Sequence, residues 1–513
     1  MNVTPLPGKS RARVLVVGAG PTGMVAAITL ARYGIDVLLI EKRDDVSRLS
    51  RNLVISTRGM ELMRAWGLEE AVRAGGTGVE PRAWVTSSLA SREGQEMPLG
   101  YPTAEEAAAV SPSRATWVAQ DHHEPILLAY LRTLPTAQVR FQTELVDLRQ
   151  DGRAVHATVR DGASAATYDA EADYVIAADG ARSAVREHLD LTLVGPDDLA
   201  EYHRVEFEGP LAAIAGERRY GLYVITDPGV AGVLAPRGLG DRWSLSREWK
   251  PGQPRFDDHS DEELQQLIAR AAGQPGLASR IERVTSFAFA AQLADGYRRG
   301  RGFLVGDAAH RMTPRGGTGM NTGIQDAFDL AWKLAWVLRG WVSEDLLDSY
   351  EAERRPVAQH NVSRAGEPGG ARRATDQALP WDLNGRIAHH WVRQAAGTVS
   401  TLDLIGDGLT ALAGPAEARW TDPAGATTCP VTVRVLDMMS TEALGLAPGG
   451  ALLVRPDGHE ICRWPTYEGT DWPRRGLAAL CTQPSSAPQN NPQHPGGCTP
   501  CPSKRSGRPA PRR

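Results

Sequence analysis

Cysteine is scarce and unevenly placed in this sequence. The chain has 513 residues and five cysteines, and none of the five lies in the first 428 residues. A disulfide framework is therefore excluded for most of the chain, and a reducing, cytoplasmic location fits best. Long apolar runs are also lacking. None approaches the roughly 20 residues that a membrane-spanning helix needs, so we expect no membrane segment.

An excess of positive charge is lacking too. Lys and Arg number 57, Asp and Glu number 61, and the net charge is −4. Nucleic-acid backbones are therefore not expected partners. The 42% hydrophobic content excludes a wholly disordered chain,. At roughly 150 residues per domain, the length predicts about three domains.

What is present begins with a βαβ pattern. A short apolar strand at 14–17 precedes a helix at about 21–33 and a second apolar strand at 37–40. Between the first strand and the helix lies GxGxxG, the pattern of a dinucleotide-binding turn. Its free N–H groups suit a pyrophosphate, and the acidic residue after the second strand suits a ribose. The residues concerned are Gly18, Gly20, Pro21, Thr22, Gly23, Glu41 and Lys42. A strand–turn–helix without a ligand is the alternative.

Two further motifs share this geometry. Asp179-Gly180 directly follows a buried strand at 174–178, and Gly306-Asp307 follows another at 303–305. Ligands bind at the carboxyl ends of strands in an open α/β sheet. A glycine-rich loop at 314–323 then precedes a long helix predicted over about 321–338. Each aspartate alone could be a helix cap, but together the motifs favour one extended ligand.

These motifs resemble those of FAD-dependent aromatic hydroxylases of the para-hydroxybenzoate hydroxylase type. The match covers roughly residues 12–360. It includes GxGxxG with its glutamate, Asp179-Gly180-x-x-Ser183-x-x-Arg186, Gly306-Asp307-Ala-Ala-His310 and Pro314-x-x-Gly317-x-Gly319-x-Asn321. The later Glu353-Arg-Arg-Pro356 also fits. The run Asp326-Ala-Phe-Asp-Leu-Ala-Trp-Lys333 fits as well. The fold that the resemblance implies is α/β.

The sequence pattern predicts further elements. A helix is predicted near 58–74, and a second, largely antiparallel sheet from about 190 to 295. Within that region Ser260 and Glu263 form a capping box before a helix,. A shorter helix around 346–355 is predicted to end at Pro356,.

The resemblance implies roles for individual residues. Asp307 would hydrogen-bond the ribityl chain of FAD, and the loop 314–321 would lie against the isoalloxazine. Gln120 matches a glutamine that contacts FAD. Arg51 matches an arginine close to FAD and the nicotinamide nucleotide, although Ser50-Arg51-Asn52 departs from the usual Pro-Arg-Ala. The other implied cofactor residues are Asp179, Gly180, Pro314, Gly317, Gly319, Met320 and Asn321.

The resemblance also implies an organisation into interleaved domains. A doubly wound FAD-binding domain would comprise residues 1–76, 118–189 and 296–370. A mixed-sheet substrate domain would comprise 77–117 and 190–295. A thioredoxin-like domain with its linker would occupy 371–480. Residues 481–513 would form a disordered tail, because 482–513 hold eight prolines and no acids,.

The implied reaction is hydroxylation of an aromatic substrate. NAD(P)H would reduce FAD, and reduced flavin with O2 would give a C4a-hydroperoxide that hydroxylates a phenolic or polyketide-like ring. The cofactor carries this chemistry, so we predict no dedicated catalytic side chain. Tyr220, Tyr223 and Trp243 are candidates for lining the substrate cavity, although core packing is the alternative. Baeyer–Villiger oxygenation, FAD-dependent reduction and a flavin-binding protein without turnover remain alternative functions.

We predict no metal site. Cys498-Thr-Pro-Cys501 has a spacing that suits zinc, but it stands alone in the proline-rich tail. Asp121-His-His-Glu124 lies on a predicted helix, where we expect a solvated face.

Overall fold

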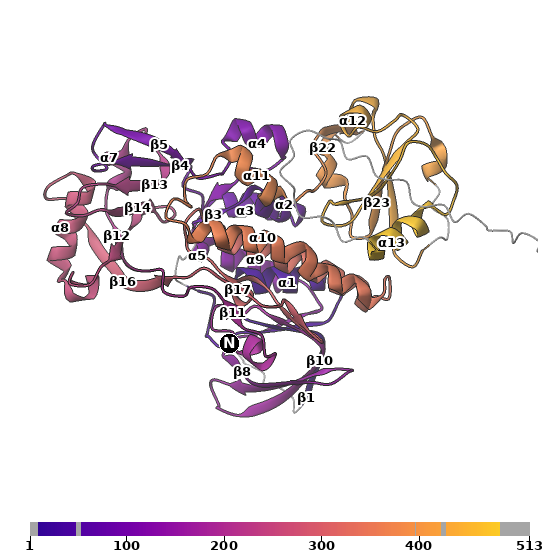
Figure 1. Cartoon of the computed structure of the whole chain (residues 1–513), viewed down its shortest axis with the longest axis horizontal. Helices are drawn as coiled ribbons and strands as arrows, with labels where there is room; N and C mark the ends of the chain where they lie inside the picture. The colour runs from indigo at the N-terminus through magenta and orange to yellow at the C-terminus, as the bar shows by residue number, and fades with distance from the viewer. Residues whose placement is uncertain (1–8, 48–52, 395–396, 422–426, 483–513) are drawn as a thin grey trace, which may run out of the picture.

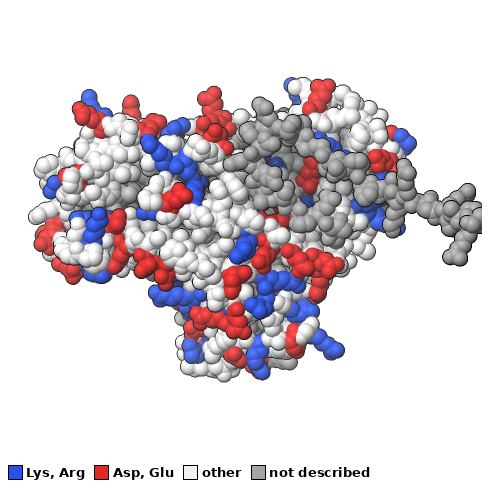
Figure 2. All heavy atoms as spheres, in the orientation of Figure 1, with Lys and Arg blue, Asp and Glu red and all other residues white. Residues whose placement is uncertain are grey.

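The computed structural model describes residues 9–47, 53–394, 397–421 and 427–482. Arg51, Cys498 and Cys501 therefore lie outside the described residues, as does the predicted tail from residue 483 onward. Figure 1 shows a central body of sheet and helices, with a second sheet to its left and a smaller C-terminal unit to its right. Lysines, arginines and acids are interspersed over the face drawn in Figure 2.

The central sheet is mostly parallel. Its strand order is β18-β19-β10-β1-β2-β7, and β8 and β9 extend from β10 as an antiparallel hairpin. Core strand residues are buried on both sides, as in β2 and β19, because helices cover a parallel sheet. The strands are β1 (Lys9–Val17), β2 (Val37–Ile40), β7 (Ala137–Arg140), β8 (Thr143–Gln150), β9 (Val155–Asp161), β10 (Thr167–Ala177), β18 (Arg298–Arg299) and β19 (Gly302–Leu304).

Four helices pack on this sheet. They are α1 (Pro21–Arg32), α5 (Gln120–Leu131), α9 (Gly319–Leu338) and α10 (Asp348–Gly366). The sequence predicts that Pro356 ends the helix before it, which is wrong, because α10 continues through this proline. Buried residues on both sides of Pro356, such as Arg354 and Val357, hold the helix together. Packing here outweighs the loss of one backbone hydrogen bond.

A single helix predicted over 58–74 is in fact two. α2 (Thr57–Ala65) and α3 (Glu69–Arg73) are separated at Gly67, whose φ of +73° is outside the helical range. The apolar spacing of this segment continues across the break, so the pattern alone did not reveal it. Gly67 supplies the left-handed turn that reverses the chain.

The second sheet is largely antiparallel, as the sequence predicts. Its order is β16-β12-β15-β14-β13-β4-β5, with one parallel pair between β13 and β4. Helix α8 (Asp261–Ala272) covers one face (Figure 1), and the capping box of Ser260 and Glu263 is confirmed. The strands are β4 (Glu80–Thr86), β5 (Gly94–Pro98), β12 (Ala200–Glu208), β13 (Tyr220–Ile225), β14 (Gly232–Pro236), β15 (Arg242–Trp249) and β16 (Arg280–Phe289).

The C-terminal unit is built on a four-stranded sheet of order β24-β23-β25-β26. Its strands are β23 (Leu409–Ala413), β24 (Val431–Val435), β25 (Ala451–Val454) and β26 (Glu460–Trp464), with α12 (Met438–Ala443) and α13 (Trp472–Thr482) beside them. β23 pairs in parallel with β24 and antiparallel with β25. This is the unit that we expected to be thioredoxin-like.

Shorter elements connect these bodies. They are β3 (Val54–Ile55), α4 (Ala104–Val110), β6 (Thr116–Trp117), α6 (Ala184–His188), β11 (Leu193–Val194), α7 (Leu211–Ala215), β17 (Gln292–Ala294), β20 (His310–Arg311), α11 (Thr375–Leu383), β21 (Trp391–Gln394) and β22 (Gly397–Ser400). Among the described helices, none combines the length and apolar character needed to cross a membrane. The domain limits given above stay a prediction.

Candidate functional site

The three predicted motifs meet at one edge of the central sheet. In the parallel ladders Val17 pairs with Ala177, and Ala177 pairs with Leu304. Strands β1, β10 and β19 therefore end side by side. The residues that follow them, Gly18, Asp179 and Gly306, come together at the carboxyl edge where an extended ligand binds.

Each glycine of GxGxxG has a different steric role. Gly18 has a φ of +104°, and a Cβ there would lie 2.3 Å from the carbonyl oxygen of Ala178. A Cβ on Gly23 would lie 1.9 Å from the carbonyl oxygen of Gly18, so helix α1 packs tightly on β1. Around Gly20 nothing lies within 4 Å of such an atom. Space is thus kept open directly over the N-terminus of α1.

The Glu41 side chain links this turn to the end of the next strand through hydrogen bonds. Its Oε2 accepts a hydrogen bond from the backbone N–H of Ala19 at 2.9 Å, and Oε1 accepts one from Arg43 at 3.1 Å. The neighbouring Lys42 is exposed. The carboxylate is therefore held at the edge of the sheet, beside the open space over Gly20.

Asp179 and Arg186 link the second motif to the third. Burial raises the pKa of Asp179, and its Oδ1 has no hydrogen-bond partner among the described residues. Arg186 donates from Nη1 to the carbonyl oxygen of Ala308 at 3.2 Å and from Nη2 to that of Ala181 at 3.1 Å. Gly180 has a φ of +84° and nothing within 4 Å of a built Cβ, so this turn also borders open space.

The third motif lies against the first. A Cβ on Gly306 would lie 3.0 Å from Oγ1 of Thr22, and one on Gly323 would lie 2.7 Å from the same atom. Helix α9 thus approaches α1 closely at the turn. Asp307 is exposed although its neighbours Gly306 and Ala308 are buried, so its carboxylate faces the open edge.

A buried ionic network beneath this motif was missed by the sequence analysis. Asp326 accepts hydrogen bonds from Nε of Arg354 at 2.9 Å and from the backbone N–H of Gly306 at 3.3 Å, and lies 2.6 Å from Nε2 of His310. Burial acts to raise the pKa of Asp326, but Arg354 and His310 hold it below its usual value. The network fixes the turn that carries Asp307. Asp326 lies in the helix segment 326–333 that also resembles the hydroxylase family. Its spacing there is the only feature of the sequence that could have indicated the network.

We call the glycine-rich loop at residues 314–321 the flavin loop, after the role that the resemblance predicts for it. The loop is anchored by Asn321. This buried amide accepts a hydrogen bond from the N–H of Ser56 at 2.8 Å and donates to the carbonyl oxygens of Val54 at 3.2 Å and Gly317 at 2.9 Å. Met320 is buried beside it. Gly317 has a φ of +62°, which a side chain would disfavour. The loop backbone, rather than its side chains, therefore borders the site. Pro314 and Gly319 also belong to this loop.

Gln120 lies at the start of α5, where it is buried. Its Nε2 donates to Glu124 at 2.5 Å, and the other Glu124 oxygen accepts from the N–H of Ser47 at 2.9 Å. His123 and Glu124 are buried rather than solvated, so the expectation of a solvated face on this helix is wrong. Burial lowers the pKa of His123 to about 4, which keeps the imidazole neutral.

The aromatic candidates for the substrate cavity do not face the flavin loop. Tyr223 pairs with Leu234 on β14 and with Trp84 on β4, and it packs with Trp243 in the cluster under α8. The Tyr223 hydroxyl donates to the carbonyl oxygen of Arg218 at 2.5 Å. Tyr220 stacks on Trp84, and its hydroxyl donates to Glu96 at 2.7 Å. Tyr223 and Trp243 belong to the buried cluster under α8, and Tyr220 packs against the same cluster from the start of β13. The core-packing alternative therefore fits all three.

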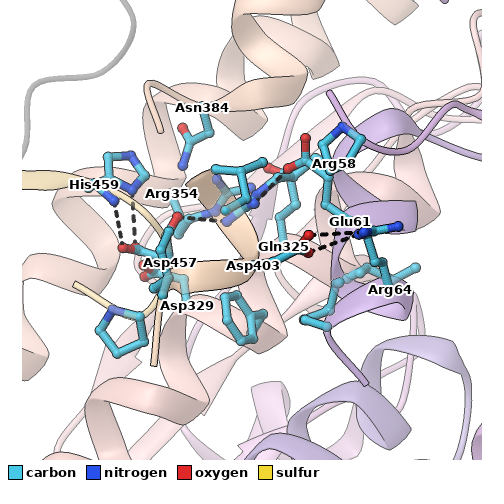
Figure 3. A pocket seen from close by; sticks show the side chains of 18 residues that line it. Arg58, Glu61, Arg64, Gln325, Asp329, Arg354, Asn384, Asp403, Asp457 and His459 are labelled. Carbon is cyan, nitrogen blue, oxygen red and sulfur yellow. Dashed lines mark hydrogen bonds and ion pairs between the residues drawn. The ribbon is translucent and has the colours of Figure 1, made fainter. Parts of the chain in front are cut away.

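Three acids come together elsewhere, but they do not form an open metal site. Oxygens of Asp329, Glu353 and Asp457 lie within 4.8 Å of one another. Lys333 lies 2.8 Å from Asp329 and 2.9 Å from Glu353, and Arg455 lies 2.7 Å from Glu353. The protein's own cations therefore neutralise the cluster. It borders a pocket of about 280 Å³ between α2, α9 and the C-terminal unit, lined by mixed charges (Figure 3).

The residues at the sheet edge fit FAD. The open space over Gly20 and Gly180 admits a pyrophosphate near the free N–H groups of α1. Glu41 and Asp307 offer carboxylates at two points along this edge, each suited to hydroxyl groups. The flavin loop offers backbone groups before the N-terminus of α9, a helix that favours negative charge there. A long ligand with a diphosphate centre and hydroxylated arms matches this sequence of groups.

Comparisons with known proteins agree with this geometry. Residues 11–365 match the family model described as FAD binding domain, and residues 383–483 match that of the aromatic-ring hydroxylase C-terminal domain. The chain is 33% identical to a putative polyketide hydroxylase of Streptomyces halstedii, covering 87% of this chain and 92% of the relative. It is 34% identical to a tetracenomycin B2 monooxygenase-dioxygenase of Streptomyces olivaceus, covering 90% and 97%.

A solved structure of aklavinone-11 hydroxylase with FAD and aklavinone superposes with a TM-score of 0.82. It is 30% identical, and the match covers 92% of this chain and 99% of that one. The fold class and the expected resemblance are therefore confirmed. The chain belongs to the family of FAD-dependent aromatic hydroxylases, and it is a flavoprotein monooxygenase.

Proposed function

We propose that this enzyme hydroxylates a polycyclic aromatic substrate of the polyketide type in the cytoplasm. We further propose that FAD lies along the sheet edge described above, with its isoalloxazine against the flavin loop. The names of the relatives support this choice, since they refer to tetracenomycin, aklavinone and polyketide hydroxylation. The observation that carries the proposal is the breadth of the sheet face that looks toward the flavin loop.

One row of side chains crosses that face. The strand registers align Arg204, Ser246, Val233, Val224 and Val85, which lie on β12, β15, β14, β13 and β4. Neighbouring strands are about 4.8 Å apart, so the row from β12 to β13 spans about 14 Å. This is about the length of a three- to four-ring system and much more than a single benzoate needs.

The central part of this face remains accessible. Leu222 and Val224 are only half-buried, although they lie on a strand flanked on both sides. Both pack at the edge of the cluster that contains Trp117 and Tyr101, and the Tyr101 hydroxyl donates to the carbonyl oxygens of Gly316 and Gly317 at 3.0 Å. An aromatic substrate on this face would therefore lie next to the flavin loop.

The other end of the face offers hydrogen-bond donors. Arg204 donates from Nε to Ser246 at 3.1 Å, and its guanidinium lies 4.9 Å from the ring centre of Phe287. Arg237 is 1% exposed and lies 3.1 Å from Glu206. Its Nε and Nη1 have no hydrogen-bond partner among the described residues. Buried donors of this kind suit the carbonyl or hydroxyl oxygens of an oxygen-rich ring system.

Bound FAD supplies the activation of O2, and NAD(P)H supplies the electrons. A single dinucleotide fingerprint is present in the sequence, so NAD(P)H has no second site of this type and must bind transiently. The chain's own residues bind the cofactor, orient the ring and exclude water. The apolar face around Leu222 and Val224 holds the ring, while Arg204 and Arg237 fix its oxygens.

Substrate-dependent oxidation of NAD(P)H tests this proposal. We expect 1,8-dihydroxyanthraquinone to bind and to accelerate NAD(P)H consumption far more than 2,4-dihydroxybenzoate does. Under oxygen-18 gas the product should gain one labelled oxygen as a new ring hydroxyl. A product without added oxygen would indicate reduction, and a lactone would indicate Baeyer–Villiger oxygenation. Acceleration by single-ring benzoates alone would contradict the polycyclic proposal.

A steric variant tests the location of the substrate. Val224→Trp places an indole on the accessible face, so we expect at least tenfold weaker binding of 1,8-dihydroxyanthraquinone with FAD retained. Binding is measured by the change in the flavin spectrum on titration. Val146→Trp is the matched control, because Val146 is 41% exposed on the β8–β9 hairpin. Equal binding by both variants would place the substrate elsewhere.

Removing the carboxylate of Asp307 tests its proposed contact with FAD. A lost charge-assisted hydrogen bond costs about 1.5–3 kcal/mol, so Asp307→Ala should bind FAD roughly 10- to 150-fold more weakly. Titration of the apoprotein with FAD measures this affinity. Asp197→Ala removes an exposed carboxylate between β11 and β12 and should leave the affinity unchanged. An unaltered affinity in folded Asp307→Ala would remove this residue from the site.

A further inference from the structure

Two arginines outside the motifs that resemble the hydroxylase family form hydrogen bonds with the flavin loop. Arg373 donates from Nη2 to the carbonyl oxygen of Gly316 at 2.8 Å and to that of Leu99 at 2.7 Å. Arg364 donates from Nη2 to Oγ1 of Thr318 at 2.9 Å. A Cβ on Gly316 would lie 3.0 Å from Nη1 of Arg364 and 3.1 Å from Nε of Arg373. Both guanidinium groups therefore touch the same turn of the loop.

Within the described ranges, neither arginine has a carboxylate within 4.0 Å. Their contacts are carbonyl oxygens, the Thr318 hydroxyl and the ring of Tyr101, whose centre lies 5.5 Å from the Arg373 guanidinium. Nε of each arginine is buried without a hydrogen-bond partner there. Three other buried arginines are each paired with an acid: Arg354 with Asp326, Arg386 with Glu61 and Arg455 with Glu353.

The surrounding groups do not neutralise this pair. Glu367 is exposed, and Asp382 is engaged by the N–H of Arg58 at 3.2 Å and by Gln325 at 3.1 Å. Arg315 adds a third positive charge on the loop, and His360 is stacked on Trp381. Burial and the neighbouring Arg373 lower the pKa of Arg364 to about 10. The two charges thus repel each other, and no carboxylate of the described residues lies within 4.0 Å to compensate them.

Uncompensated charge in a partly buried site is costly unless an opposite charge comes close. Hydride transfer from NAD(P)H delivers two electrons and one proton to FAD, which leaves the reduced flavin with one negative charge. We propose that Arg364 and Arg373 stabilise this negative charge across the flavin loop and thereby favour reduced over oxidised FAD. The inference rests on the proposed position of the isoalloxazine against that loop.

The midpoint potential of bound FAD tests the inference. We expect Arg364→Met and Arg373→Met each to weaken the binding of reduced FAD about tenfold relative to oxidised FAD. For a two-electron couple this corresponds to about 30 mV toward negative potential. A merely structural role would weaken both redox states alike and leave the potential unchanged. Arg339→Met is the matched control, because Arg339 donates to the carbonyl oxygen of Tyr33 at the other end of α9.

Variants that keep the charge complete the test. Arg364→Lys and Arg373→Lys should stay within about twofold of the wild-type ratio, even if the methionine variants fail to retain FAD. A tenfold fall in the lysine variants, or an unchanged potential in flavin-loaded methionine variants, would overturn the inference. A wild-type protein that binds no FAD would instead refute the proposed position of the cofactor. The two failures are therefore distinguishable.

Discussion

Gly20→Val is expected to abolish the retention of FAD while the protein stays folded. Gly20 has a φ of −73° and a ψ of 178° as the residue before α1, a conformation that valine adopts without strain. Nothing in the protein lies within 4 Å of the new Cβ, so the side chain enters only the space proposed for the pyrophosphate. We expect the affinity for FAD to fall at least about 100-fold, or roughly 2.7 kcal/mol.

Flavin absorbance after desalting measures retention, and circular dichroism reports the fold. Gly369→Val is the matched control, since this exposed glycine also has nothing within 4 Å of a built Cβ and no positive φ. It should retain FAD fully. Full retention of FAD by Gly20→Val would show that the pyrophosphate does not lie over α1 and that FAD binds elsewhere.

Arg455→Met is expected to destabilise the attachment of the C-terminal unit to the FAD-binding part. Arg455 is 2% exposed and donates to Glu353 of α10 at 2.9 and 2.7 Å and to Asp457 at 2.8 Å. Methionine leaves the three buried carboxylates of Asp329, Glu353 and Asp457 together. Of their described partners, Lys333 and His459 then remain. Removal of one partner from such a buried network costs about 3–5 kcal/mol. Urea unfolding of the flavin-loaded protein measures the loss.

The same variant has a predictable pH dependence. Burial acts to raise the pKa of Glu353, but Lys333 and Arg455 lower it to about 2. A lowered carboxyl pKa contributes stability above the unfolded value of 4.5, and this contribution is lost as the pH falls toward 2,. The difference between wild type and Arg455→Met should therefore be full at pH 7 and shrink below about pH 4.5.

A surface arginine of the same unit provides the control. Arg475 lies 3.0 Å from Glu468, and both side chains are more than 40% exposed. Arg475→Met should cost less than about 1 kcal/mol, because exposed ion pairs contribute little. Equal stability losses in the two variants, or none in Arg455→Met, would contradict the role given to the buried network.

The sequence allowed the carboxyl edge of the central sheet to be predicted because each part was local. Gly18, Asp179 and Gly306 each follow a short apolar run, and such runs form buried parallel strands. The shared edge then follows from the topology of the fold. The same positions serve both the fold and the proposed ligand, because the tight turns require glycine and the ligand requires polar groups such as aspartate.

Features that depend on packing between distant segments could not be predicted. The continuation of α10 through Pro356 depends on buried neighbours, whereas local propensity favours a break. Tyr223 and Trp243 are aromatic in either role, and only the strand register shows that they face α8. Arg364 and Arg373 belong to no recognisable motif, and their contact with Gly316 arises from the return of the chain after α10.

The visible absorption spectrum of the purified protein, recorded after incubation with FAD and desalting, shows directly whether the sheet edge binds FAD. We expect a retained flavin spectrum that is bleached by NAD(P)H in the absence of oxygen. A folded but colourless protein would contradict it, because every residue assigned to the sheet edge would then be present without the cofactor that the edge is built to hold.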